Sequence, residues 1–383
     1  MADAAAELAR RGHRVVVFTA DRGYDDPSER YPAREEVDGV EIVRLPYCSF
    51  GKRSIGVRLL GGFSFVLQAI VRSFPLGHLD VILVSTSPPV APLGALVIAA
   101  LRSAAIKYWV MDLNPDQIVA LGMLGPHAIP VRMFEWLNRR ILRAAADVVV
   151  LDRFMADRIN RKVDVSQKLV IIPPWPHDDH LGDVPPGANP FRRLHDLDGK
   201  FVLMYSGNHG PTNPIQTVLE ALRRLEQEPR LVGLFVGGGI GKREVEALES
   251  PGIRSLPYQP LSDLKYSLSA ADVHLVTIGS DAVGIVHPSK VYGALAVGKP
   301  ILLLGPLESH VGDLLREADI GWHIDQGDVE GAVVLLRRLL QAPAEEVAAR
   351  GARGRVLVRT KFGKERLCGA FCDIVERGLQ PSP

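Results

Sequence analysis

Short apolar runs rich in β-branched residues alternate with longer segments of helical periodicity along this chain. No other feature constrains the fold as much, because this alternation is typical of parallel sheets covered by helices. In the first half, strands are expected at 14–20, 40–45, 81–85, 106–111, 148–151 and 169–172, with helices at 2–11, 56–73, 93–103, 130–146 and 154–161. In the second half, strands are expected at 201–206, 231–236, 253–256, 273–277 and 300–304, with helices at 214–226, 261–269, 289–296, 308–317, 331–340, 344–360 and 364–378. The sequence therefore predicts an α/β protein with two Rossmann-like domains.

A segment rich in Pro, Gly and Asp separates the two arrays. The predicted divisions are a first domain at 1–176, a linker at 177–200, a second domain at 201–360 and a last segment at 361–383. Two such lobes are expected to face a cleft. In parallel sheets, ligands bind beyond the carboxyl ends of the strands, so site residues are sought in the loops that follow strands.

Charge and composition exclude several classes of function. The net charge is +1, from 45 basic and 44 acidic residues, which argues against a nucleic-acid partner. The three cysteines make no complete zinc-ligand set and indicate a reducing compartment, so a cytoplasmic location is predicted. The apolar stretch at 81–101 is interrupted by Pro88, Pro89 and Pro92, and is expected to form a strand, a loop and a helix rather than a membrane span.

A glycine-rich loop containing Gly238 and Gly239 follows the strand expected at 231–236 and leads to Lys242. The backbone N–H groups of such a loop can meet an anion where a helix begins. Lys242 stands where the dinucleotide-binding fingerprint needs glycine, and the loop also lacks the pattern of a Walker motif. We predict that Gly238, Gly239 and Lys242 bind a nucleotide-sugar. A tight turn without a ligand is the alternative.

A second candidate segment precedes the helix that Pro288 and Ser289 are expected to begin. A cation in the first turn, Lys290, is unfavourable for the helix dipole unless an anion shares the site. Lys290 is therefore predicted to stabilise a phosphate, with a solvated surface lysine as the alternative. His287 is expected either to contact a phosphate or sugar hydroxyl or to cap the helix. The predicted donor contacts in this segment are Gly284, Ile285, Val286, His287 and Lys290.

The loop after the strand at 201–206 is unusually rich in polar side chains for a plain turn. Gly207 allows close backbone approach, while Asn208, His209 and Asn213 supply neutral hydrogen-bonding groups. We predict that this loop also contacts the donor.

The loops of the first half supply candidates for the acceptor. Asp112 follows a strand and is predicted to hold or deprotonate an acceptor hydroxyl, whereas Asp116 could equally be a helix cap. Ser85, Thr86 and Ser87 end the preceding strand and are expected to line the same side. No metal-binding Asp-x-Asp motif is found in these loops, so neither a metal nor a cofactor is expected.

Seven segments carry a family resemblance: LARRGHRVVVFT at 8–19, DLNP at 112–115, IPPW at 172–175, YSGNH at 205–209, FVGGG at 235–239, HPSK at 287–290 and GKP at 298–300. In this order they resemble the family 4 retaining GT-B glycosyltransferases, particularly the colanic-acid and O-antigen-type transferases of bacterial polysaccharide synthesis. The resemblance implies a first domain for a glycan or lipid-linked acceptor and a second for a UDP-type donor. It also implies metal-independent transfer with retention, a last helix that crosses back to the first domain, and a donor base near Tyr258.

Two departures from the family pattern concern the site. Asn208 and Asn213 stand where the family usually has Arg and Lys, and Ile285 and Gly293 stand where it has two glutamates. Two alternatives therefore stay open beside the transferase. One is a GT-B nucleotide-sugar epimerase, and the other is a catalytically weak homologue that binds nucleotide-sugar as a partner subunit.

Two further expectations concern the first domain. The segment at 52–65 mixes basic and apolar residues and is expected either to lie on an anionic membrane or to pack as an ordinary helix. The family begins with a strand and a glycine-rich loop ahead of a helix like the one at 2–11. The central strand of the first sheet is therefore expected to be missing from this chain, leaving two strand edges unpaired.

Overall fold

A computed structural model describes residues 1–23, 28–48, 55–176, 181, 184, 187–248 and 250–379 of the chain. The chain forms two compact units. Unit 1 contains Met1–Pro173 together with Glu365–Pro383, and unit 2 is Pro174–Lys364. Parts of the predicted linker and of the segment at 52–65 lie outside the described residues.

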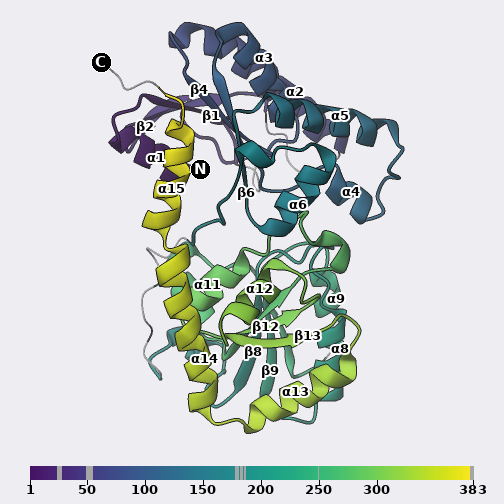
Figure 1. The fold of residues 1–383 in the computed structure, drawn as a ribbon. Coiled ribbons are helices and arrows are strands. Elements are labelled where there is room, and N and C mark those ends of the chain that lie inside the picture. The colour runs from purple at the N-terminus through teal and green to yellow at the C-terminus, as the bar shows by residue number, and fades with distance from the viewer. Residues whose placement is uncertain are drawn as a thin grey trace. The chain divides into compact units, whose positions relative to one another are not determined.

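Unit 1 contains two sheets (Figure 1). The first has the order β1-β3-β2, with β1 (Val15–Ala20) parallel to β3 (Val40–Leu45) and β2 (Arg34–Val37) antiparallel to it. The second is parallel throughout and has the order β4 (Val81–Ser85), β5 (Ala105–Trp109), β6 (Asp147–Val150) and β7 (Leu169–Ile171). The helices of this unit are α1 (Ala2–Arg10), α2 (Ile55–Ser73), α3 (Ala91–Arg102), α4 (Asp116–Ala120), α5 (Ile129–Ala144), α6 (Arg153–Lys162) and α15 (Lys364–Glu376).

Within the described part of unit 1, β1 pairs only with β3 and β4 pairs only with β5. Every residue of β1 is partly exposed, although its sequence VVVFTA is that of a buried strand, whereas all four residues of β6 are buried. Among the described residues, β1 and β4 are therefore edge strands of their sheets.

The last helix, α15, packs within unit 1 although unit 2 precedes it in sequence. The rings of Trp109 and Phe371 lie 4.4 Å apart, and the Cys372 thiol lies 3.6 Å from the carbonyl oxygen of Ala4. The amine of Lys107 donates to Asp147 at 2.5 Å and to the Arg377 carbonyl at 2.7 Å. The middle of this helix and the residue that follows its carboxyl end thus contact residues from the first half of the chain.

Unit 2 is a doubly wound domain with one six-stranded parallel sheet of order β10-β9-β8-β11-β12-β13. Its strands are β8 (Phe201–Ser206), β9 (Leu231–Val236), β10 (Ile253–Leu256), β11 (Val273–Thr277), β12 (Ile301–Leu304) and β13 (Gly321–Ile324). Its helices are α7 (Pro190–Leu194), α8 (Gln216–Arg224), α9 (Lys242–Glu246), α10 (Leu264–Ser269), α11 (Lys290–Ala296), α12 (His310–Glu317), α13 (Val329–Gln341) and α14 (Ala344–Leu357). The strand order reverses between β8 and β11, so a ligand is expected at the carboxyl ends of these strands.

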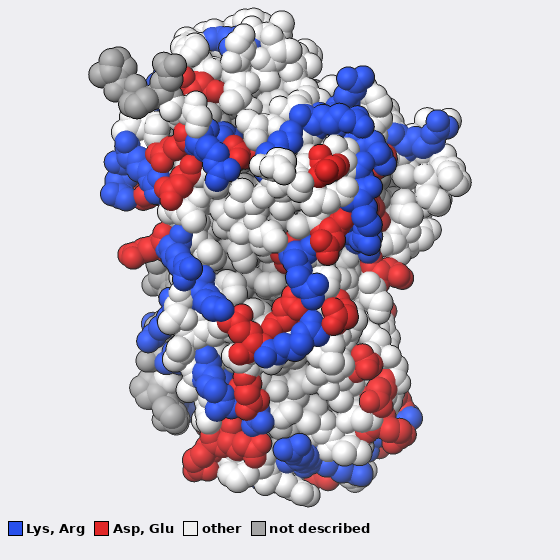
Figure 2. All heavy atoms as spheres, viewed as in Figure 1, with Lys and Arg blue, Asp and Glu red and all other residues white. Residues whose placement is uncertain are grey.

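The structure differs from expectation at 187–200, which was predicted as linker. This stretch contains α7, and both Phe191 and Leu197 are buried in a core cluster with Val202 and Met204 of β8. The segment is therefore part of the packed domain. Over unit 2, basic and acidic side chains are interspersed on the face shown in Figure 2.

Candidate functional site

Two of the predicted donor loops form one structure at the carboxyl ends of β8 and β9. The backbone N–H of His209 donates to the carbonyl of Gly238 at 2.7 Å, and the N–H of Gly241 donates to the carbonyl of His209 at 2.9 Å. Asn208 lies exposed at the tip of the first loop. The loops that the sequence predicts as separate candidates thus lie against each other beside the point where the strand order reverses.

Glycine is required in these loops because backbone and side chains approach closely. A Cβ on Gly207, which has a φ of +135°, would lie 2.7 Å from Cε of Lys290. A Cβ on Gly239, with a φ of +119°, would lie 2.3 Å from Oδ1 of Asn208. Both positions have a positive φ, which favours glycine, and at Gly239 a Cβ would also lie 2.8 Å from the carbonyl oxygen of His209. The glycines therefore have a structural reason to be present besides any contact with a ligand.

Lys290 comes from the first turn of α11 and reaches under the loop that follows β8. Its amine lies 4.0 Å from the ring centroid of Tyr205, donates to the Tyr205 hydroxyl and lies 3.4 Å from the carbonyl of Asn208. Among the described residues its partners are therefore an aromatic ring and neutral oxygens, not a carboxylate. Burial lowers the pKa of Lys290 to about 7. A buried cation without a counter-ion favours the binding of an anion at this loop.

Lys242 is held by backbone carbonyls. Its amine donates to the carbonyl of Gly237 at 2.9 Å and to that of Leu256 at 3.0 Å, which joins the ends of β9 and β10. Beside it, the ring of Tyr258 lies close enough to Gly238 that a Cβ there would be 3.0 Å from Cε2 of the ring. Tyr258 is 60% exposed, so a ring surface is accessible next to the glycine loop.

His209 is buried between aromatic rings. Its ring centroid lies 4.6 Å from that of Tyr205, and its Nδ1 lies 3.2 Å from the carbonyl of Gly238. That contact assigns the proton to Nδ1. Burial, with Lys290 and Lys242 nearby, lowers the pKa of His209 and so favours the neutral ring. Its buried Nε2 has no hydrogen-bond partner among the described residues.

The residues from Gly284 to His287 are all predicted to contact the donor, but they differ in burial and in hydrogen bonding. Gly284 has a φ of +70°, and Ile285 is 1% exposed, so only its backbone could face a ligand. His287 Nε2 lies 2.9 Å from the Tyr292 hydroxyl, which lies 2.8 Å from Nε2 of His310. The structure thus places His287 at one end of a His–Tyr–His chain that the sequence analysis did not find.

The other two predicted donor residues lie at the margins of these loops. Val286 is half-buried and follows Ile285 directly. The side-chain amide of Asn213 lies 3.4 Å from the hydroxyl of Thr212, and its backbone N–H donates to Gly210.

In unit 1, the predicted acceptor residues gather at the carboxyl ends of the neighbouring strands β4 and β5. The hydroxyl of Thr86 accepts hydrogen bonds from the backbone N–H groups of Met111 and Asp112, both at 3.2 Å. The hydroxyl of Ser85 lies 3.3 Å from the carbonyl of Ser87. Asp112 is exposed. Thr86 thus fixes the backbone from which the Asp112 carboxylate extends.

Asp116 differs from the other acceptor candidates. It is the first residue of α4 and its carboxylate lies 2.7 Å from the amine of Lys162, which also pairs with Glu135. Its side chain is 16% exposed. Asp116 is therefore part of an ion-pair network that joins α4, α5 and α6, and it is not the N-cap that was the alternative.

Comparison with known proteins shows the family to which this chain belongs. Residues 1–175 match the model of the glycosyl transferase 4-like domain, and residues 189–355 match that of the glycosyl transferases group 1. WbjE of Pseudomonas aeruginosa, named as a probable glycosyltransferase, is 30% identical over 76% of this chain and 74% of its own. WcaI of Escherichia coli strain K12, named provisionally as a colanic acid biosynthesis glycosyl transferase, is 28% identical over 91% of this chain and 90% of its own.

Solved structures share the fold at lower identity. WaaG, a glycosyltransferase involved in lipopolysaccharide biosynthesis, superposes with a TM-score of 0.69 at 17% identity, covering 98% of this chain and 95% of its own. Anabaena HepE in complex with UDP also has a TM-score of 0.69, at 12% identity, covering 97% of this chain and 93% of its own. Both support the assignment of two Rossmann-like domains.

Proposed function

Because this chain belongs to the glycosyltransferases, with a 4-like first domain and a group 1 second domain, we propose that it transfers a sugar from a UDP-sugar. The proposed acceptor is a glycan or lipid-linked glycan of bacterial cell-surface polysaccharide synthesis. The name of WcaI supports the pathway, and the UDP complex of HepE supports the nucleotide.

The observation that carries the proposal is the buried amine of Lys290 beneath the glycine loops. When the sugar of a UDP-sugar is transferred, UDP is the leaving group and negative charge develops on its diphosphate. Stabilising that charge is the main contribution such a site can make to catalysis. Lys290 supplies a cation whose described partners are uncharged. In this proposal the diphosphate needs no metal ion, and the configuration at the transferred carbon is retained.

The other predicted residues take roles around the diphosphate. Tyr258 offers its exposed ring to the base, whereas His209 is buried and supports the loop between Tyr205 and Gly238. Asp112, held by Thr86, positions the acceptor hydroxyl from unit 1.

The proposal is tested by two measurements on the full chain. Calorimetric titration with UDP and UDP-glucose should give binding, and mass spectrometry of reactions with a panel of UDP-sugars and glycan acceptors should reveal one glycosylated product. Binding without any product would favour the nucleotide-sugar-binding homologue. Release of an epimerised nucleotide-sugar would favour the epimerase. Absence of nucleotide binding would overturn the proposal.

Asp112→Asn is expected to lower turnover about tenfold while UDP affinity stays within about twofold, because one charged hydrogen bond to the acceptor is lost. The measurement is steady-state kinetics with the acceptor found by the product screen, beside calorimetry with UDP. Asp157→Asn, which changes another exposed aspartate of unit 1, is the matched control and should behave as the wild type. Equal losses of UDP affinity and turnover in Asp112→Asn would contradict the acceptor role.

A further inference from the structure

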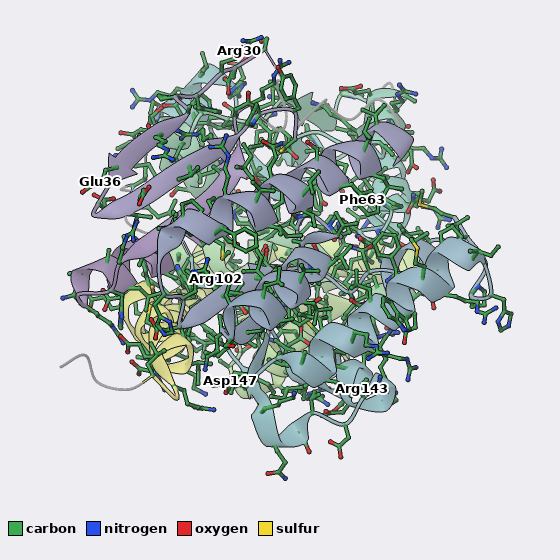
Figure 3. All side chains as sticks on the ribbon, turned by 90° about the horizontal axis from the view of Figure 1, so that it is seen from above. Arg30, Glu36, Phe63, Arg102, Arg143 and Asp147 are labelled. Atoms are coloured by element: carbon green, nitrogen blue, oxygen red, sulfur yellow. The ribbon has the colours of Figure 1, made fainter. Side chains whose placement is uncertain are left out.

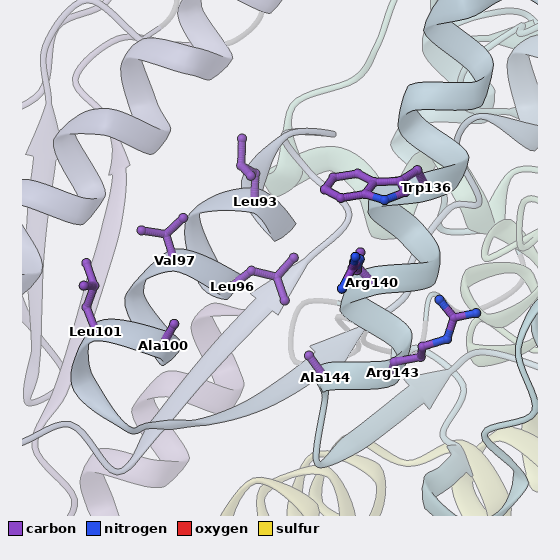
Figure 4. A pocket seen from close by; sticks show the side chains of 9 residues that line it. All are labelled: Leu93, Leu96, Val97, Ala100, Leu101, Trp136, Arg140, Arg143 and Ala144. Atoms are coloured by element: carbon purple, nitrogen blue, oxygen red, sulfur yellow. The ribbon is translucent and has the colours of Figure 1, made fainter.

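Several cations of this chain lie over aromatic rings. In unit 1, the guanidinium of Arg102 (labelled in Figure 3) lies 6.0 Å from the ring centre of Phe74. The guanidinium of Arg140 lies 5.4 Å from the ring centre of Trp136, beside the groove between α3 and α5 that Figure 4 shows. Phe74 and Trp136 are 54% and 55% exposed. Water therefore screens both of these pairs, and each ring contributes little to the state of its cation.

Lys290 and Tyr205 in unit 2 form a closer and more deeply buried pair. The amine lies 4.0 Å from the ring centre, and Tyr205 is 0% exposed. The ring packs against those of His209 and Phe235, whose centroids lie 4.6 Å and 6.4 Å away. On the other side, the lysine stem passes Gly207, where a Cβ would lie 2.7 Å from Cε. The amine therefore lies on a ring that is fixed by packing and that water does not reach.

The hydroxyl of Tyr205 can only accept a hydrogen bond from this amine. A phenol has one proton, and that of Tyr205 is donated to the carbonyl oxygen of Asn208 at 2.6 Å, so only lone pairs remain for Lys290. The amine lies 3.4 Å from the same carbonyl oxygen, which is also an acceptor. Both oxygens therefore favour the ammonium ion over the neutral amine, and they oppose the burial that lowers the pKa of Lys290.

The other titratable groups near this pair are His209, Lys242 and Tyr258. Burial, with Lys290 and Lys242 nearby, lowers the pKa of His209, and burial, with Tyr258 nearby, raises the pKa of Tyr205. A neutral imidazole and a second lysine offer no negative charge to the amine. Among the described residues, its stabilising contacts are therefore the ring and hydroxyl of Tyr205 and the carbonyl of Asn208.

We propose that Tyr205 is a positioning residue for sugar transfer, whose ring and hydroxyl hold the amine of Lys290 beneath the glycine loops and keep it charged for the diphosphate. Tyr205 is too deeply buried to contact a substrate itself, so it acts through Lys290. This inference rests on the proposed function, because the diphosphate is that of the UDP-sugar. Loss of the hydroxyl should first change the proton affinity of the amine.

The first test needs no nucleotide. The full chain is treated with a trace of acetic anhydride over about pH 5 to 10, and mass spectrometry of peptides gives the acetylation of Lys290, which only the neutral amine undergoes. In the wild type the midpoint should lie at the pKa of about 7. In Tyr205→Phe it should fall by about one to two pH units, as expected for one lost charge-assisted hydrogen bond. Tyr205→Leu, which also removes the ring, should lower it at least as far.

The second test asks whether the charged amine serves the diphosphate. The ligand for calorimetry is UDP-glucose, because its diphosphate has no group that titrates in this range. At pH 7, Tyr205→Phe should bind UDP-glucose roughly tenfold more weakly than the wild type, since little of the amine is then charged. At about pH 5, where the amine regains its proton, the difference should shrink to about threefold or less. A structural defect would weaken binding equally at both pH values.

The matched control is Tyr266→Phe, which removes a hydroxyl from another tyrosine of unit 2 with a lysine amine, that of Lys265, 4.8 Å from its ring centre. It should leave the labelling midpoint and the affinity as in the wild type, and circular dichroism should show that every variant is folded. An unchanged labelling midpoint in Tyr205→Phe, or an equal shift in the control, would overturn the role of Tyr205.

The two tests also separate this inference from the proposed function. If the wild type did not bind UDP-glucose, the proposed function would fail, while the labelling midpoint would still decide whether Tyr205 controls the amine. A shifted midpoint with a loss of affinity that is the same at both pH values would show that the amine does not serve the diphosphate, and would overturn the inference.

Discussion

Replacement of Lys290 by alanine is expected to weaken UDP-glucose binding roughly tenfold to a hundredfold, the equivalent of one charge-assisted hydrogen bond of about 1.5–3 kcal/mol. The structural reason is the amine held over Tyr205, whose described partners are uncharged. The measurement is calorimetric titration at pH 7. Lys290→Met retains most of the aliphatic stem that packs against Gly207 and should show the same loss, so a lost charge can be separated from lost packing. Lys265→Ala removes a lysine elsewhere in unit 2 and should leave affinity unchanged.

The pH dependence of the same titration gives an independent check. Burial lowers the pKa of Lys290 to about 7, and the protonated amine is the form that binds a diphosphate. Affinity should therefore be nearly constant below this pKa and fall as the pH rises above it, by at most about tenfold per pH unit. In Lys290→Met this fall should disappear. Persistence of the fall in Lys290→Met would assign it to another group and remove Lys290 from the diphosphate site.

Lys107→Ala is expected to lower the free energy of unfolding by about 3–5 kcal/mol, the largest stability effect predicted for this chain. Lys107 is 1% exposed, and its amine pairs with the Asp147 carboxylate, whose side chain is 5% exposed. Removing the lysine leaves a buried carboxylate with Arg377 as its remaining ion-pair partner, at 2.9 Å. It also removes the hydrogen bond to the Arg377 carbonyl at the end of α15. The measurement is urea denaturation followed by circular dichroism.

Two comparisons test whether the loss of stability in Lys107→Ala arises because the ion pair is buried. Lys107→Met combined with Asp147→Leu should cost less than the sum of the single replacements, because neither charge is then left unpaired. Arg316→Ala breaks exposed ion pairs with Glu308 and Asp313 and should cost less than about 1 kcal/mol. If Lys107→Ala were no more destabilising than Arg316→Ala, the buried pair would not hold α15 in place.

The regular elements of the fold could be predicted because their sequences carry a strong period. The strands expected at 231–236 and 253–256 have the observed bounds. The strand expected at 14–20 begins one residue early, and the one expected at 148–151 is shifted by one residue at both ends. β2 was missed because its sequence, REEV, is charged and pairs at the edge of a sheet. β13 was missed because GWHI has neither an apolar run nor a clear alternation. β2 is defined by its hairpin pairing with β3 and β13 by its parallel pairing with β12, rather than by a pattern in either strand's own sequence.

The site could be predicted only as far as single loops. The polar loops at 205–213 and 236–242 are recognisable because glycine and amide side chains follow a strand. Contacts between side chains from different loops left no such signal. The ring of Tyr205 under Lys290, the carbonyls that hold the amine of Lys242, and the chain from His287 to His310 all depend on tertiary packing. The sequence around a lysine in the first turn of a helix does not indicate whether its amine is solvated or buried.

The position of α15 constrains the order in which the two units can complete folding during synthesis. Unit 2 is complete in sequence at Lys364, whereas unit 1 takes Glu365–Pro383 from the end of the chain. The partners that Phe371 and Cys372 contact, Trp109 and Ala4, leave the ribosome more than 250 residues earlier. Domains usually fold from the amino terminus as they emerge. Here unit 1 acquires its last contacts only after unit 2 has been synthesised, so a nascent chain must keep the surface that receives α15 uncovered until that helix has emerged.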